Sequence, residues 1–195
     1  MGALALTTLE HTRAPDGLPQ VRAVAWSSGV RAAAPFAPRL VVDGPGGSVS
    51  HPTPRTPRAL RFLGDRLLVL DEAGELRRDV EAPEVLGTFV GATELAVGGP
   101  TVAVLAGDLH VLRAPFDLPA TVIALGPHAT AVAVSQDGEQ VLVGSLGGAV
   151  QAWTRAGDLL FEARAHTERV SAAVAVDDGW ITAGWDGRVR RWSST

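Results

Sequence analysis

Five histidines are the first residues of this sequence to test for chemistry, because a neutral imidazole can bind a metal or carry a proton. A zinc site would need a close His pair with a carboxylate or a third ligand. His11, His128 and His166 instead each follow a predicted outer strand in a different repeat, whereas His51 and His110 lie on predicted third strands. We therefore expect no metal site and no cofactor.

Two pairs of adjacent carboxylates are the next candidates, since two facing carboxyl groups can hydrolyse a glycosidic bond. Asp71-Glu72 and Asp177-Asp178 both lie in predicted turns, where acidic side chains favour the turn itself. The sequence contains no G-x-S-x-G nucleophile motif and no glycine-rich phosphate-binding loop. We expect no catalytic activity, with a glycosidase kept as a less favoured alternative.

The composition narrows the class of protein further. The 195 residues include no cysteine, so disulfides, thiolate metal sites and cysteine nucleophiles are excluded. A net charge of −4 argues against nucleic acid as the partner, and 46% hydrophobic residues argue against disorder. No signal-like segment or apolar run of membrane-spanning length is present, so we expect a cytoplasmic protein with no membrane partner. Lys, Asn and Tyr are absent, which suggests a GC-rich bacterial genome.

The elements that position these residues are clearest from Gly157 to Thr195. This stretch contains four short segments in which apolar and polar residues alternate, as Val170, Ala172, Val174 and Val176 do. Two Asp-Gly turns, at 178–179 and 186–187, separate them. Period-two alternation between such turns predicts four antiparallel strands, one blade of a β-propeller.

The segments AHTERVSAAVAVDDG and WITAGWDGRVRRW within this stretch resemble a repeat of the WD-repeat family of β-propellers. In that family a His, a Ser or Thr, the turn Asp and a Trp form a hydrogen-bonded set inside one blade. The resemblance places His166, Thr182, Asp186 and Trp192 in this set. It implies a structural role, because a fully satisfied buried polar network favours a single geometry.

Similar repeats can be followed back towards the N-terminus. Five inner strands are predicted near Val21, Leu60, Leu95, Val132 and Val170, at spacings of 39, 35, 37 and 38 residues. They predict one all-β domain over 1–195, a five-bladed propeller with blades at about 18–57, 58–91, 92–126, 127–166 and 167–195. In the first blade, 21–29, 39–47 and SVSHP are taken as its first three strands, and 52–57 as a rim loop or degenerate outer strand.

The last blade lacks an outer strand after Trp192, and the N-terminus offers one. GALALTTLEHT (2–12) superposes on GDLLFEARAHT (157–167), with Leu4 over Leu159 and Leu6 over Phe161. We expect 1–12 to complete the fifth blade and to cover its open edge.

The residue before the turn Asp, Trp185, is the best candidate for contact with a partner, since this turn lies on the partner-binding face of the resembled family. Its counterparts in the other repeats are predicted to be Pro45, Glu72, Leu105 and Leu146. An apolar rim with a Trp is typical of an interface hot spot, although Trp185 could instead fold over the neighbouring blade. We therefore expect a non-catalytic protein-interaction module, an adaptor or accessory subunit of a larger bacterial assembly, that binds through Trp185, Leu146, Leu105 and His166. A carbohydrate-binding, lectin-like propeller is the alternative.

Overall fold

A computed structural model describes residues 21–125 and 128–193, and every regular element in this part of the chain is a β-strand. The all-β prediction is therefore confirmed. The predicted closing strand, 1–12, lies outside the described residues. Neither described range contains a helix that could cross a membrane.

Nineteen strands form five antiparallel sheets in which consecutive strands are neighbours. The first sheet contains β1 (Val21–Ser27), β2 (Val30–Pro35), β3 (Arg39–Gly44) and β4 (Gly47–Pro52). The second contains β5 (Pro57–Leu63), β6 (Arg66–Asp71), β7 (Glu75–Arg78) and β8 (Glu84–Thr88). The third contains β9 (Glu94–Gly98), β10 (Thr101–Ala106), β11 (Asp108–Arg113) and β12 (Thr121–Ile123). The fourth contains β13 (Ala129–Val134), β14 (Gln140–Ser145), β15 (Ala149–Thr154) and β16 (Leu159–Arg164), and the fifth contains β17 (Val170–Val176), β18 (Gly179–Gly184) and β19 (Val189–Ser193).

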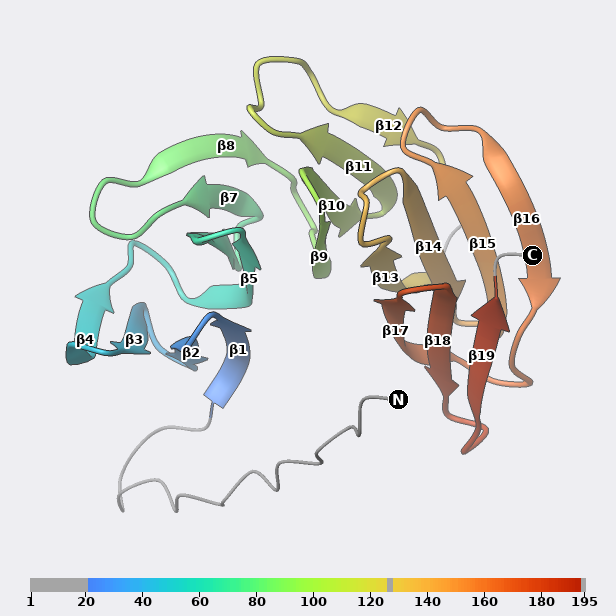
Figure 1. The fold of residues 1–195 in the computed structure, drawn as a ribbon, viewed down its shortest axis with the longest axis horizontal. Helices are drawn as coiled ribbons and strands as arrows, with labels where there is room; N and C mark the ends of the chain where they lie inside the picture. The colour runs from blue at the N-terminus through green and yellow to red at the C-terminus, as the bar shows by residue number, and fades with distance from the viewer. Residues whose placement is uncertain (1–20, 126–127, 194–195) are drawn as a thin grey trace.

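The sheets follow one another around a common centre, each with its first strand innermost (Figure 1). Apolar clusters fill the space between neighbouring sheets. Leu60 and Val69 pack against the first sheet, and Leu68 and Leu70, on the opposite face of the same strands, pack against the third. This two-sided burial explains why the β6 sequence, RLLVLD, is almost uniformly apolar, whereas a sheet with one solvated face would alternate.

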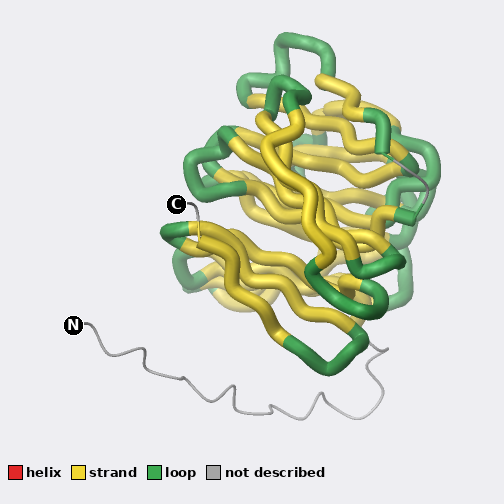
Figure 2. The backbone as a smooth tube through the Cα atoms, turned by 90° about the vertical axis from the view of Figure 1, so that its right-hand side faces the viewer, coloured by secondary structure: helices red, strands yellow, loops and turns green. Residues whose placement is uncertain are grey.

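The arrangement is an open arc of blades, with the first and fifth sheets on either side of a gap in the ring (Figure 1). Figure 2, turned by 90°, shows the yellow strands of the sheets and the green loops that connect them. The fifth sheet has three strands among the described residues, so β19 is its edge. Five sheets are present, and the closed five-bladed ring stays a prediction.

The strand assignment in the first sheet is corrected by the structure. Its second strand is β2 (Val30–Pro35), which the sequence interpretation omitted, so the segment from Arg39 forms the third strand and 47–52 forms the outer one. Small residues at 32–34 and Pro35 obscured this strand. Pro52 and Pro57 lie at strand ends, which is where a residue without an N–H donor is tolerated.

Candidate functional site

Four polar side chains form a hydrogen-bonded chain inside the fifth sheet. Trp192 Nε1 donates to Thr182 Oγ1 at 3.1 Å. His166 Nε2 lies 3.0 Å from the same hydroxyl, and His166 Nδ1 lies 2.9 Å from Asp186 Oδ1. A neutral imidazole protonated at Nδ1 satisfies every member, because the Thr182 hydroxyl then donates to Nε2 while it accepts from Trp192.

The Asp186 carboxylate also organises the turn around it. It accepts hydrogen bonds from the backbone N–H of Thr167 at 3.2 Å and of Arg188 at 3.1 Å. Burial raises the pKa of Asp186, but the hydrogen bonds from His166 and from these two amides outweigh that effect, so the pKa lies below its usual value. The carboxylate therefore joins the loop before β17 to the turn after β18.

The absence of a side chain at Gly184 leaves room for the His166 imidazole. The ring of His166 passes so close to Gly184 that a Cβ there would lie 2.5 Å from Nδ1. Trp192 stacks on Phe161 of the fourth sheet with ring centroids 6.4 Å apart. The network thus contributes to packing between the fourth and fifth sheets as well as within the fifth.

A hydroxyl, an imidazole and a carboxylate in series also make up a nucleophilic triad, so this alternative role needs a test against burial. His166 is 1% exposed and Thr182 is fully buried. The Thr182 hydroxyl is also occupied by the indole of Trp192. No substrate can reach that oxygen without unfolding of the sheet, so the geometry supports the structural role.

Successive turns of an antiparallel sheet alternate between its two ends. In each sheet the turn between the second and third strands therefore lies at the same end as the loops that connect successive sheets, and these turns share one face of the molecule. We call this the Trp185 face. The Trp185 side chain is 65% exposed, and Leu146, in the equivalent turn of the fourth sheet, is 47% exposed. The backbone N–H of each residue donates to the loop before its own inner strand, Trp185 to Arg169 and Leu146 to His128.

Two residues predicted on this rim are not at the surface. Leu105 is 1% exposed and lies inside β10, because the turn of the third sheet contains only Gly107 and the rim position is missing from it. His166 is buried with both ring nitrogens engaged, so it cannot contact a partner. The structure therefore does not place Leu105 and His166 on the exposed rim, contrary to the sequence prediction.

The counterpart of Trp185 in the first sheet is Phe36, which the sequence interpretation missed. Pro45, the predicted counterpart, lies in the turn between β3 and β4 at the opposite end of the sheet. Phe36 is 59% exposed, and the guanidinium of Arg22 lies 5.4 Å from its ring centroid. Arg169 lies 5.1 Å from the ring of Trp185 in the same manner. The signal in the sequence was APFAP, an aromatic residue between two prolines, but it could be interpreted only after β2 had been placed.

The carboxylate pairs are engaged in local structure. Asp71 is buried and accepts hydrogen bonds from the backbone N–H of Ala73 and of Glu75, as a turn-forming aspartate does. Asp177 accepts from the Gln136 amide, and Asp178 binds the Arg191 guanidinium with both oxygens. The structure brings neither pair to the central pocket described next. Over 21–125 and 128–193, no three His, Asp or Glu side chains cluster closely enough to bind a metal ion.

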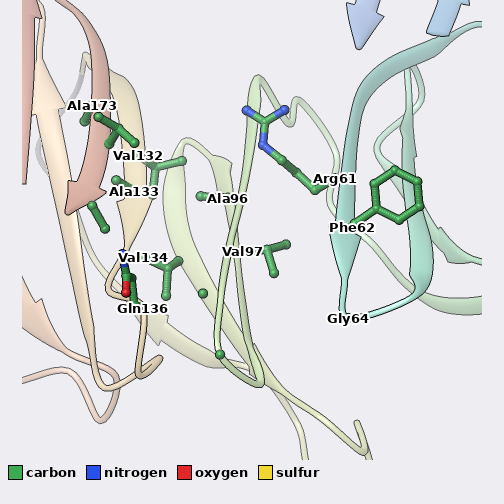
Figure 3. A pocket seen from close by; sticks show the side chains of 14 residues that line it. Arg61, Phe62, Gly64, Ala96, Val97, Val132, Ala133, Val134, Gln136 and Ala173 are labelled. Carbon is green, nitrogen blue, oxygen red and sulfur yellow. The ribbon is translucent and has the colours of Figure 1, made fainter. Parts of the chain in front are cut away.

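A pocket of about 630 Å³ lies at the centre of the arc, between the inner strands of the second to fifth sheets (Figure 3). Small apolar residues such as Ala96, Val132 and Ala173 form most of its wall. Among the residues of 21–125 and 128–193 that line it, Arg61 is the only charged one. Its side chain leaves β5 on the side opposite to Phe62 (Figure 3).

Comparisons with known proteins show the fold. No protein-family model matches the sequence, and no curated protein matches it. A chain from the crystal structure of a mitotic checkpoint complex superposes with a TM-score of 0.74 and 17% identity, over 99% of this chain and 71% of the other. The computationally designed protein Ika8 superposes with a TM-score of 0.61 and 17% identity, over 89% of this chain and 71% of the other. At this identity the similarity shows a β-propeller-like architecture.

Proposed function

We propose that this chain is a non-catalytic protein-interaction module of the WD-repeat type, an adaptor or accessory subunit of a larger bacterial assembly. The observation that carries the proposal is the row of exposed apolar side chains on the Trp185 face. Four of the sheets have a residue at the position of Trp185 in the turn between their second and third strands. In three of them this residue is an exposed apolar one: Phe36, Leu146 and Trp185. Exposed aromatic residues with apolar neighbours are typical of the centre of a protein interface.

The environment of Trp185 supports this role. A Trp that folded over the neighbouring blade would lose most of its exposure, but this side chain keeps 65% of it. Its described ring contact is the guanidinium of Arg169, a geometry that orders an indole and leaves its other face free. A pre-ordered aromatic side chain loses little conformational entropy when a partner covers it.

A carbohydrate-binding propeller is less well supported. A lectin with one sugar site per blade would repeat its aromatic platform, whereas the equivalent turns carry Phe36, Glu72, Leu146 and Trp185, and the third sheet lacks the position. A glycosidase would need two carboxylates at the pocket, whereas Arg61 is the only charged residue among the described residues that line it.

Ring closure by the N-terminal segment is part of the same proposal. The edge of β19 and the outward faces of the first and fifth sheets are apolar, with Val24, Trp26, Val174 and Val189 all more than half exposed. Such an edge and such faces favour further β-structure. Eight residues lie between Thr12 and Val21, compared with four or five in the other loops between sheets, so the segment is long enough to cross to β1. We further propose a cytoplasmic location without membrane, nucleic-acid, metal or cofactor partners, in keeping with the net charge of −4.

Affinity purification with the full chain as bait tests the interaction. Trp185→Ala and Phe36→Ala should each reduce recovery of a partner about thirtyfold or more, because truncation of an interface hot spot costs about 2 kcal/mol or more. Leu118→Ala is the matched control, since Leu118 is exposed in the turn between β11 and β12 at the opposite end of the sheets. Equal recovery with Trp185→Ala, Leu118→Ala and the unmodified chain would contradict the proposal.

A further inference from the structure

Three arginines lie on or directly before the inner strands that line the central pocket, and one of them, Arg61, is part of its wall. Arg58 and Arg61 lie on β5, and Arg58 reaches the loop before β9 through its hydrogen bond to the Ala92 carbonyl. Arg169 directly precedes β17, the strand that forms the part of the pocket wall around Ala173. Glu94, the first residue of β9, is close enough to all three for their positive charges to affect its carboxylate. Burial raises the pKa of Glu94, and the charges of Arg61, Arg169 and Arg58 oppose this rise without cancelling it. Glu94 is therefore a partly desolvated carboxylate in a region of positive charge.

These guanidinium groups have unused hydrogen-bonding capacity. Arg61 and Arg58 each donate one Nη1 bond of 2.8 Å to a backbone carbonyl, of Leu60 and Ala92 respectively. The Nε atoms of Arg58 and Arg169 are buried and have no hydrogen-bond partner within the part of the chain that the structure describes. Across the described ranges, none of the three forms an ion pair within 4.0 Å, although Arg66, Arg78, Arg113, Arg155 and Arg191 all do.

We propose that Arg58, Arg61 and Arg169 bind an acidic segment of the protein partner, with one of its carboxylates in the central pocket beside Arg61. The proposal rests on the proposed function and adds the chemistry of the partner. A guanidinium group binds a carboxylate through two parallel hydrogen bonds, and it does so most strongly where water is excluded. The pocket of about 630 Å³ accommodates a few side chains. Trp185, stacked on Arg169, extends the same surface for an apolar residue of the segment.

Glu94 gives the site a built-in competitor. In the free protein its carboxylate partly neutralises the cluster, and a ligand carboxylate must share the same arginines with it. Replacing Glu94 with Gln should therefore tighten binding of an acidic ligand, the opposite of what the loss of an ordinary contact residue would do. This inverse effect distinguishes a carboxylate site from an unspecific basic surface.

The test uses fluorescence anisotropy with a fluorescein-labelled peptide of six glutamates and its six-glutamine counterpart as probes. The glutamate peptide should bind the full chain and the glutamine peptide should not. Arg61→Gln should weaken binding about tenfold or more, because a charge-assisted hydrogen bond is lost. Arg164→Gln is the charge-matched control, since Arg164 is exposed on the outer strand β16. Arg61→Lys should retain part of the affinity, and circular dichroism reports whether each variant is folded.

Four results would overturn the inference: equal binding of the two peptides, an equal loss with Arg61→Gln and Arg164→Gln, weaker binding by Glu94→Gln, or displacement of the peptide by inorganic tripolyphosphate below the peptide's own Kd. The last result would assign the site to phosphate. Failure of the proposed function is distinguishable. If Trp185→Ala reduces partner recovery but the glutamate peptide does not bind, only this inference fails. If the peptide binds through Arg61 but Trp185→Ala leaves partner recovery unchanged, the proposed function fails.

Discussion

The Nδ1 atom of His166, in the loop before β17, lies 2.9 Å from the Oδ1 atom of Asp186, in the turn after β18. This contact joins two loops at the same end of the fifth sheet, between residues that are twenty apart in sequence. It orients the imidazole so that Nε2 meets the Thr182 hydroxyl, and so sets the geometry of the whole network. A buried network of this kind affects stability first, and the predictions below separate stability from binding.

Thr182→Val should destabilise the protein by about 1–3 kcal/mol, because it leaves the Trp192 indole N–H and His166 Nε2 buried without a partner. Thr182→Ser, which keeps the hydroxyl, should cost clearly less. Urea unfolding followed by circular dichroism measures both. Equal stability of the valine variant and the wild type would show that the network contributes nothing to folding.

Asp186→Asn should lower the thermal midpoint in a pH-dependent way. The pKa of Asp186 is lowered in the folded state, so its carboxylate stabilises the fold at every pH above the unfolded value of about 3.9. That contribution is lost as the pH falls through the lower, folded pKa. The difference in Tm between wild type and variant should therefore be constant from neutral pH to about pH 5 and shrink below about pH 4.

The pKa values of Asp137, Glu139 and Asp178 are also lowered, but these groups titrate in both proteins and cancel in the comparison. A difference in Tm that grows as the pH falls towards 3 would contradict the role of the Asp186 carboxylate.

Gly184→Ala should destabilise the protein by about 1–3 kcal/mol, because the added methyl group would overlap the His166 ring. Gly147→Ala is the control: it lies in the turn after β14, which corresponds to the turn after β18, and a Cβ there meets nothing within 4 Å. Differential scanning calorimetry on the two variants decides the point. The interpretation of Gly184 fails if both substitutions leave Tm unchanged.

Deleting residues 1–10 tests closure of the ring. If Leu4 and Leu6 are buried against the fifth sheet, each contributes roughly 1.5–3 kcal/mol, a large share of the 5–15 kcal/mol of a typical domain. The truncated chain should melt at a lower temperature and associate through its open edge, which size-exclusion chromatography with light scattering would detect. Leu4→Ser with Leu6→Ser in the full chain should reproduce the loss. A monomeric truncated protein with unchanged Tm would rule out closure by this segment.

The sequence by itself determined the local architecture. Alternating residues and Asp-Gly turns predict β17 to β19, because strand period and turn chemistry depend on neighbours in the chain. The hydrogen-bonded network also depends on residues close in sequence. Its members lie within 27 residues, in and beside a sheet whose register follows from its turns: His166, Thr182, Asp186 and Trp192. Their identification needed only the resemblance to a known repeat.

The composition of the exposed face depended on features that the sequence interpretation could not resolve. A turn shortened to Gly107 removes the rim position from the third sheet, and an unpredicted β2 moves the first-sheet position from Pro45 to Phe36. One misplaced strand or a change of two residues in turn length shifts every later assignment in a sheet, because register is counted from the turns.

The arginine site was decided by tertiary structure alone. Arg58 and Arg61 are more than a hundred residues from Arg169 in the sequence, and Glu94 belongs to a third sheet. No periodicity of the sequence connects them. They form the proposed site because the inner strands of the second to fifth sheets line the same pocket, where burial and charge act across sheets rather than along the chain.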